Sequence, residues 1–274
     1  MRLVLFTGLV MIAFAANSVL NRMALVGAET GPAAFALVRL GAGAVMLVVL
    51  ANLRAGIIPW RAPGRVWGVA ALALYVIGFS FAYVTLETGT GALILFGGVQ
   101  ITMFFGAVWM KEDMPPARWI GAIIAFAGLI VLLWPAGGAV PDIFGAVLMA
   151  AAALGWGVYS LLGRGGSNPL GATAANFALA LPIGAICFLL LPDNLSLAGG
   201  VLAVISGAVT SGVGYALWYM ALPKLAASVA SVAQLSVPLI AVAGGLVFLG
   251  EPLSLRFLIA ALLVLSGVVV SLRR

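Results

Sequence analysis

Residues 112–131 read EDMPPARWIGAIIAFAGLIV, and residues 251–270 read EPLSLRFLIAALLVLSGVVV. The two stretches align without a gap at a shift of about 140 residues, a period long enough to be a whole folding unit, and the alignment pairs Gly128 with Gly267. Each stretch is an acidic turn followed by an apolar run that approaches the length of about 20 residues at which a helix crosses a bilayer. The chain is therefore predicted to contain two copies of one membrane-embedded unit.

Weaker matches at nearly the same shift extend the duplication along the rest of the chain. They pair 14–22 (FAANSVLNR) with 156–164 (WGVYSLLGR), Gly78 and Tyr83 with Gly214 and Tyr219, and Pro32 with Pro169, which sets Arg39 opposite Asn176. The repeat thus covers nearly the whole sequence, and we expect a first unit at 1–135 and a second at 142–274.

The composition places the surface of the fold in lipid. Hydrophobic residues make up 65% of the 274 residues and charged residues only 7%, with a mean hydropathy of +1.27. A soluble domain carries about 25% charged residues, so a chain this poor in charge cannot cover its core in water. The net charge of +6 comes from basic residues between apolar blocks rather than on one face, which argues against nucleic-acid binding.

The chain has no histidine and a single cysteine, Cys187, inside an apolar run. Most zinc and haem sites and histidine-based catalysis are thereby excluded, and we expect neither a metal nor a cofactor. A buried structural thiol is the reading that the run around Cys187 favours.

Ten apolar blocks are long enough to cross the membrane, and they lack the alternation of barrel strands. The first block also resembles a signal peptide, but the repeat requires it as a span. We therefore expect an all-α integral membrane protein with ten transmembrane helices arranged as two five-helix repeats. The predicted spans are residues 2–21, 32–52, 66–86, 89–110, 116–135, 142–163, 169–191, 199–221, 226–249 and 254–272.

Basic residues divide unequally between the two sides of these spans. Only Arg22 and Arg256 fall on the side opposite the N-terminus, and Arg39 lies inside a span. By the positive-inside rule both termini are predicted to be cytoplasmic, which for a bacterium means a multi-pass protein of the inner membrane. The residues on the N-terminal side are Arg2, Arg54, Arg61, Arg65, Lys111, Arg118, Arg164, Lys224, Arg273 and Arg274.

Five spans per copy is an odd number, so the second copy enters the membrane from the opposite side. Inverted repeats are the architecture by which many secondary transporters alternate access to one site at the repeat interface. A duplicated structural protein or an intramembrane enzyme would share this arrangement without transporting anything. Transport is the interpretation that the inverted repeat favours.

The chain resembles the EamA-type domains of the drug/metabolite transporter superfamily. The resemblance rests on PAAFALVR (32–39), on Glu112 with AGLIV, and on LGEPL (249–253) with SGVVV, in the same order in each copy. It implies ten spans, cytoplasmic termini and export of amino acids or other metabolites, most similar to the bacterial exporters of aromatic and neutral amino acids. The first copy departs from the usual Gly-Glu pair with Lys111-Glu112-Asp113, which leaves the role of Glu112 open.

Polar residues within membrane spans are costly and usually face a bundle interior or a water-filled cavity. Arg39, about 10 Å into its span at roughly 1.5 Å per residue, is the only full charge well inside the bilayer. It either attracts a substrate carboxylate or pairs structurally with backbone carbonyls or Asn17. The candidate substrate-binding residues are Asn17, Arg39, Tyr75, Phe79, Gln100, Trp156, Tyr159, Asn176, Tyr215 and Gln234.

Two glutamines near the middle of their spans offer donor and acceptor together, which suits a zwitterion. Gln100 follows Gly97-Gly98, and Gln234 precedes Pro238 by one helical turn, where proline frees a backbone carbonyl. Interhelical contacts explain the same glutamines equally well. The aromatic candidates form either the wall of a small-molecule pocket or ordinary helix packing, and Tyr83 and Tyr219 near span ends indicate an interfacial belt.

The sequence carries no acidic or histidine group at mid-membrane, which favours facilitated diffusion, with proton exchange through a carboxylate at a span end as the alternative. It has no P-loop and no GxSxG motif, so ATP-driven transport and serine hydrolase chemistry lack their residues. We expect a non-enzymatic exporter of small metabolites, amino acids including aromatic ones, acting as a monomer or weak homodimer. The alternatives are a drug or multidrug carrier of the same fold, a channel, and an intramembrane enzyme.

Overall fold

The computed structural model describes residues 2–27, 29–54, 57–111, 115–134, 141–163, 166–221, 233–234 and 236–271. Within these residues the regular structure is entirely helical, as the apolar blocks predicted. The elements are α1 (Arg2–Leu25), α2 (Pro32–Leu53), α3 (Arg65–Ala82), α4 (Thr88–Trp109), α5 (Pro116–Leu133), α6 (Ile143–Leu162), α7 (Pro169–Leu190), α8 (Leu197–Val204), the π-helical segment η1 (Ile205–Val213), α9 (Gly214–Ala221), α11 (Ser236–Gly244), the π-helical segment η3 (Gly245–Leu249) and α12 (Leu255–Ser271).

Eight helical stretches in the described part of the chain are long and apolar enough to cross a membrane. The eighth, Leu197–Trp218, runs through α8, η1 and α9. Two further apolar stretches, Ser236–Leu249 and Leu255–Ser271, are shorter. They fall in the ninth and tenth predicted spans, and the predicted span 226–249 begins at residues outside those described. Eight spans are thus supported directly, and the full count of ten remains a prediction.

Helix starts follow the local chemistry of the sequence. The helices α2, α5 and α7 begin at prolines, whose missing N–H would have no partner in the first turn. Asp142, Asn168 and Ser196 cap α6, α7 and α8, because a side-chain oxygen of each accepts a hydrogen bond from the backbone N–H three residues later. These boundaries match the turns predicted from Pro, Asn and Asp positions.

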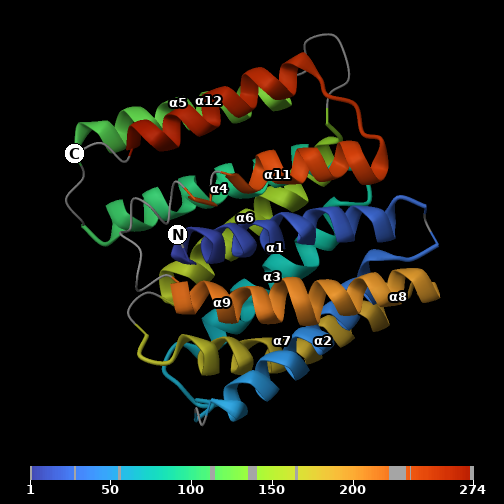
Figure 1. Cartoon of the computed structure of the whole chain (residues 1–274). Helices are drawn as coiled ribbons and strands as arrows, with labels where there is room; N and C mark the ends of the chain where they lie inside the picture. Colours follow the sequence, from blue (N-terminus) through green and yellow to red (C-terminus); the bar gives the residue numbers. More distant parts are fainter. Residues whose placement is uncertain are drawn as a thin grey trace.

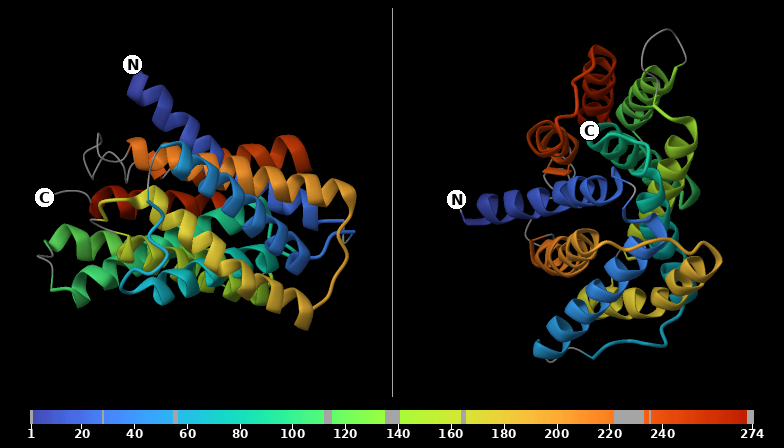
Figure 2. Two further views of the ribbon diagram at one scale, coloured as in Figure 1. Left: turned by 90° about the horizontal axis from the view of Figure 1, so that it is seen from below. Right: turned by 90° about the vertical axis from the view of Figure 1, so that its right-hand side faces the viewer.

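The helices lie side by side, with α5 and α12 along one edge and α2 and α7 at the opposite edge (Figure 1). Contacts join α5 to α12, α4 to α11, α2 to α7 and α3 to α6, while α1 packs on α8, η1, α9 and α11. Figure 2 shows the beginning of α1 projecting away from the other helices. Helices from the two halves of the chain therefore alternate through the bundle rather than forming two separate bodies.

Gly128 on α5 and Gly267 on α12 allow their helices to approach closely. A Cβ at Gly267 would lie 2.5 Å from the backbone nitrogen of Ala125, and one at Gly128 would lie 2.9 Å from that of Val264. The shift that pairs Gly128 with Gly267 also pairs Ala125 with Val264. The two contacts are therefore reciprocal, and small residues make this packing possible.

Large apolar side chains cover the outside of the bundle. Trp109 is 90% exposed, and Leu189 and Ile57 are also largely exposed. Exposure of such side chains is unfavourable in water but not in the hydrocarbon of a membrane. Tyr83, predicted to belong to an interfacial belt, is instead fully buried against Phe79 and donates to the Thr88 carbonyl. Cys187 is only partly buried, less than its apolar surroundings predicted.

Charged residues separate between the two ends of the bundle. We call the end where α1 finishes the acidic end; within the described residues it carries Glu29, Glu87, Asp142, Asp193 and Glu251, together with Arg22 and Arg256. The opposite end, called the basic end, carries Arg54, Arg61, Arg65, Lys111 and Arg118. The start of α1 and the end of α12 both lie at the basic end (Figure 1). The predicted residues Glu112, Arg164, Lys224, Arg273 and Arg274 lie outside the described part of the chain.

Candidate functional site

A narrow cavity lies between the two halves of the chain, near the middle of the helices. The free room inside it is that of about one water molecule, so a larger solute requires the wall to move. Aromatic rings dominate its wall, and its polar groups are one amide, two phenol hydroxyls and the indole N–H of Trp156. We call it the central cavity; its lining residues are Phe14, Asn17, Tyr75, Phe79, Leu95, Phe96, Trp156 and Tyr215. Five of the predicted site residues, Asn17, Tyr75, Phe79, Trp156 and Tyr215, thus lie together.

Arg39 on α2 stands directly behind this wall and is completely buried. Its Nη2 donates to the Tyr75 hydroxyl at 3.1 Å and to Ser211 Oγ at 3.4 Å. Its guanidinium carbon lies 4.9 Å from the ring centre of Phe79 and 5.4 Å from that of Tyr75, a distance at which the ring faces attract a cation. The predicted structural partners, backbone carbonyls or Asn17, are replaced by a phenol and a serine.

Asn17 on α1 joins the first half of the chain to η1. Its Oδ1 accepts hydrogen bonds from Ser206 Oγ at 2.8 Å and Thr210 Oγ1 at 2.5 Å, with Ser211 Oγ at 3.5 Å. The π-helical turn brings these hydroxyls onto the face toward α1, and such turns often mark functional sites. A buried amide oxygen with this many donors is fully satisfied.

Aromatic stacking leads from the central cavity toward the basic end. The ring of Trp156 stacks on Tyr215 at 5.1 Å and on Tyr159 at 5.6 Å. Tyr159 in turn accepts a hydrogen bond from Asn176 Nδ2 at 3.2 Å, and Asn176 Oδ1 accepts one from Arg65 at 2.7 Å. Tyr159 and Asn176, predicted as binding residues, therefore lie beyond the central cavity in a cluster with Arg65.

The two predicted glutamines lie away from the central cavity. Gln100 on α4 and Gln234 are both partly buried, and neither is among the residues that line it. The structure therefore does not bring the glutamines together with the aromatic residues, and a common site for all ten predicted residues is not formed.

One ion pair lies at the acidic end, where the Asp193 carboxylate also accepts from the backbone N–H groups of Ala33 and Ala34. Arg22 Nε lies 3.3 Å from Glu251 Oε1, and Arg22 Nη1 donates to the carbonyls of Tyr83 at 3.0 Å and Val84 at 2.8 Å. Both oxygens of Glu251 accept from the backbone N–H of Thr88, at 3.0 and 2.8 Å. The pair therefore joins α1, the loop after α3, the start of α4 and the loop before α12.

A left-handed glycine places the Glu251 carboxylate there. Gly250 has φ +65°, a conformation that costs little without a Cβ, and the N–H of Glu251 donates to the Gly245 carbonyl. A Cβ at Gly245 would collide with Glu251 Oε2. The N-terminal partial charge of α4 adds to the attraction for this carboxylate.

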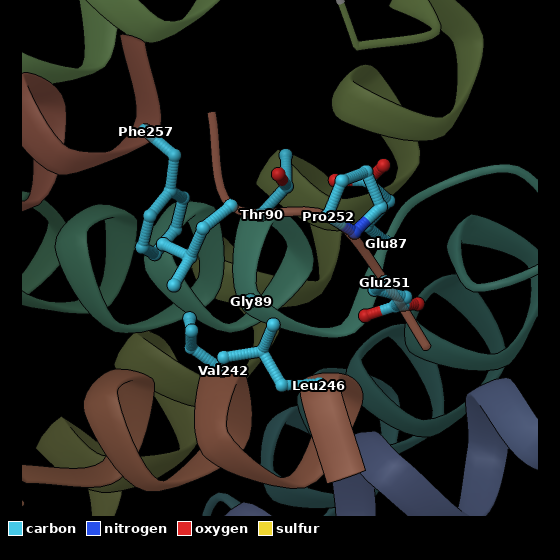
Figure 3. Close-up of a pocket in the computed structure, with 9 residues that line it drawn as sticks. Glu87, Gly89, Thr90, Val242, Leu246, Glu251, Pro252 and Phe257 are labelled. Carbon is cyan, nitrogen blue, oxygen red and sulfur yellow. The ribbon is translucent and has the colours of Figure 1, made fainter. Parts of the chain in front are cut away.

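A second pocket lies beside the pair, with Val242, Leu246 and Phe257 facing Glu251 and Glu87 (Figure 3). Loss of hydration and the nearby charge of Glu251 raise the pKa of Glu87, and Arg22 lowers it by a smaller amount. The pocket thus has two neighbouring carboxylates, of which Glu251 is paired with Arg22.

Sequence reasoning did not select Arg22, Glu251, Ser206 or Arg65 for the site. Arg22 and Glu251 are 229 positions apart, and each by itself is an ordinary charged residue at a span end. Two signals were available: the match of Arg22 with Arg164, and the serines and threonine within one apolar span.

Comparisons with known proteins give one family model and several similar proteins. A model of the EamA-like transporter family matches residues 143–273. The chain is 45% identical over 270 residues to an uncharacterized protein of Pseudomonas aeruginosa, which covers 97% of this chain and 93% of that protein. It is 27% identical over 228 residues to an uncharacterized transporter of Archaeoglobus fulgidus, covering 79% and 80% of the two chains.

Two further similarities extend over nearly the whole chain. The uncharacterized transporter YvbV of Bacillus subtilis is 26% identical over 287 residues, covering 97% of this chain and 90% of that protein. A solved crystal structure superposes with a TM-score of 0.65 over 94% of each chain at 21% identity, which shows a shared fold. Together these similarities indicate a membrane transporter and not an enzyme.

Proposed function

The chain belongs to the EamA-like transporter family of the drug/metabolite transporter superfamily, and we propose that it exports small metabolites, aromatic amino acids among them, by alternating access. The observation that carries the proposal is the central cavity, which is aromatic, lies at mid-bundle, and is built by helices of both halves. Small-molecule sites combine apolar walls with a few polar groups in this way.

We propose that residues 1–135 and 142–274 are two inverted five-helix repeats and that ten helices cross the membrane. The reciprocal packing of Gly128 on Val264 and of Gly267 on Ala125 supports this, since a two-fold relation produces such exchanged contacts. The contacts of α2 with α7 and of α4 with α11 likewise join helices at corresponding places in the two proposed repeats. Inverted repeats provide two equivalent gates around one site.

In this proposal the basic end faces the cytoplasm of a bacterium and the acidic end faces outward. The separation of basic and acidic residues supports this orientation, because basic loops stay on the cytoplasmic side. The ion pair of Arg22 with Glu251 then closes the outer face.

Growth of cells that express the chain tests export directly. Cells producing the wild-type protein are expected to tolerate fluorinated phenylalanine at concentrations that stop cells producing Trp156→Ala at equal membrane abundance. Release of labelled phenylalanine into the medium is the matching direct measurement. Tolerance of unrelated cationic dyes without tolerance of the amino-acid analogue would instead identify a drug carrier, and no difference in either assay would contradict export.

A further inference from the structure

We propose that the central cavity recognises its substrate by a carboxylate and does not require an ammonium group. The substrate class would then be organic monocarboxylates with an apolar or aromatic body, of which amino acids are a special case. The inference rests on the proposed function, in that the central cavity must carry the transported solute. It follows from the balance of charge and of hydrogen-bond donors around the cavity.

Arg39 supplies a positive charge that has no counter-charge near it. The carboxylates of the described residues all lie at the acidic end, at or beyond the ends of the helices, whereas Arg39 is completely buried on α2. Its Nε and Nη1 have no hydrogen-bond partner among the described residues. A buried charge without a partner is strongly unfavourable, so this position favours an anion.

The Tyr75 hydroxyl connects this charge to the central cavity. Because Arg39 is a donor only, Tyr75 Oη must accept the hydrogen bond at 3.1 Å and direct its own proton elsewhere. The Tyr75 side chain lines the cavity. A carboxylate oxygen that accepts the phenol proton would therefore sit one hydrogen bond from the guanidinium, which makes that bond charge-assisted.

The acceptors that an ammonium group would need are already in use. The Asn17 Oδ1 accepts from the hydroxyls of Ser206 and Thr210, and no Asp or Glu is among the described residues that line the cavity. The Trp156 indole can only donate, and the Tyr75 and Tyr215 hydroxyls can donate as well as accept. A carboxylate can therefore accept from all three groups, whereas an ammonium group finds only two phenol oxygens, of which Tyr75 already accepts from Arg39, and the faces of the rings.

The shape of the wall matches a flat apolar body. Trp156 and Tyr215 lie nearly parallel, with an interplanar angle of 20°, while Phe14 meets Tyr215 at 57°. Rings in these orientations contact an aromatic or branched aliphatic group through offset and edge-to-face arrangements. The carboxylate end at Tyr75 and the aromatic end at Trp156 are adjacent, since these two rings are 4.9 Å apart.

Three ligands that share a phenylethyl body separate the contributions of the two charged groups. L-Phenylalanine carries both, 3-phenylpropanoate carries only the carboxylate, and phenethylamine carries only the ammonium. Binding to the purified full-length protein in detergent, measured by ligand-dependent shifts of the unfolding temperature at constant ionic strength, avoids passive leakage of weak acids through a bilayer. We expect 3-phenylpropanoate to bind at least as tightly as phenylalanine, and about tenfold or more tightly than phenethylamine.

Two variants test whether Arg39 and Tyr75 bind the carboxylate. Arg39→Gln is expected to weaken 3-phenylpropanoate about tenfold or more, and Tyr75→Phe about threefold, with phenethylamine unaffected by both. Tyr75→Phe keeps the ring and so provides the test if Arg39→Gln does not fold. Ser160→Ala is the control, because the Ser160 hydroxyl donates to the Trp156 carbonyl within its own helix.

Binding of phenylalanine tenfold tighter than 3-phenylpropanoate, equal binding of phenethylamine, or no binding by any of the three ligands would overturn the inference. So would undiminished binding of 3-phenylpropanoate by both variants. Failure of the proposed function gives a different pattern: the carboxylate ligand binds as expected, yet proteoliposomes exchange no solute. If the protein exchanges phenylalanine but shows no preference for ligands with a carboxylate, the proposed function stands and the proposed carboxylate recognition is wrong.

Discussion

Arg22 and Glu251 are 229 positions apart in the sequence and form an ion pair of 3.3 Å. It is the one ion pair between residues that the structure describes. The carboxylate also binds the first N–H of α4. Because its two partners come from different segments, separation of α1, α4 and α12 at this end must break all of these bonds together. The contact between α1, α4 and the loop before α12 at the acidic end therefore depends on this small set of bonds.

Glu251→Gln should loosen this closure without changing the shape of the side chain. The change removes the charge that Arg22 and the helix terminus stabilise, an effect of about 1.5–3 kcal/mol for hydrogen bonds to charged groups. In a Cys187→Ser background, Thr90→Cys beside the pocket is expected to react severalfold faster with a membrane-impermeant thiol reagent when Glu251→Gln is present.

Asp142→Asn is the matched control for this labelling. Asp142 also caps a helix at the acidic end and bonds Thr85 in the neighbouring loop, but it does not reach Arg22. Equal labelling of Thr90→Cys in all three backgrounds would show that the Arg22–Glu251 pair does not close this end.

Glu87 should make the closure sensitive to external pH. Its pKa is raised, first by loss of hydration and then by Glu251, so a conformation that separates the two carboxylates and hydrates Glu87 has the lower pKa. Linkage then requires that protons favour the closed arrangement. As pH falls through the raised pKa, labelling of Thr90→Cys should slow by more than the falling thiolate fraction alone requires, and Glu87→Gln should remove that excess. Faster labelling of Thr90→Cys at lower pH, with Glu87 intact, would contradict the prediction that protons favour the closed arrangement.

Gly267→Ala should destabilise the pair of helices α5 and α12. The new methyl would meet backbone atoms of Ala125 and Gly121, which cannot rotate away, and overpacking of this kind costs about 1–3 kcal/mol. Gly8→Ala is the control, because nothing lies within 4 Å of a Cβ at Gly8. Thermal unfolding in detergent measures both; equal midpoints for the two variants would argue against close α5–α12 packing.

Asn17→Leu should destabilise the contact between α1 and η1. It removes the oxygen that accepts from Ser206 and Thr210 while keeping a similar volume, and a buried hydroxyl left unpaired costs about 1–3 kcal/mol. Thr7→Val on the same helix is the comparison, since the Thr7 hydroxyl donates only to the Leu3 carbonyl one turn earlier. An unfolding temperature no lower than that of Thr7→Val would show that the hydroxyls do not depend on Asn17.

Hydropathy and turn residues were sufficient to predict most of the helices. The predicted spans begin at residues 32, 116, 142 and 169, within one residue of where α2, α5, α6 and α7 begin, because helix starts depend on local chemistry. The sequence paired Gly128 with Gly267 as repeat positions, but their close approach to the opposite helix depends on tertiary packing, which the repeat pattern does not contain. Repeat symmetry, span number and membrane orientation stay predictions supported by the arrangement of the helices.

The site was predictable only in part, for a physical reason. Polar and aromatic residues inside spans gave five cavity residues, four aromatic residues and Asn17, because polar and amphipathic groups are rare in a lipid-facing chain. The partners of Arg39 and the complete burial of Tyr83 depend on how α1, α3 and η1 pack, which no local pattern contains. Gln100 and Gln234 have the same composition signal as the cavity residues, yet neither is among the residues that line the cavity.

Counterflow in proteoliposomes tests alternating access through the central cavity most directly. Vesicles loaded with unlabelled phenylalanine and diluted into trace labelled phenylalanine should accumulate label transiently above its equilibrium level, because the excess unlabelled solute inside competes with the label for exit on the carrier. Trp156→Ala should abolish the overshoot, and Ser160→Ala should retain it. Label that only equilibrates, at the same rate with or without internal phenylalanine, would identify a channel and contradict alternating access.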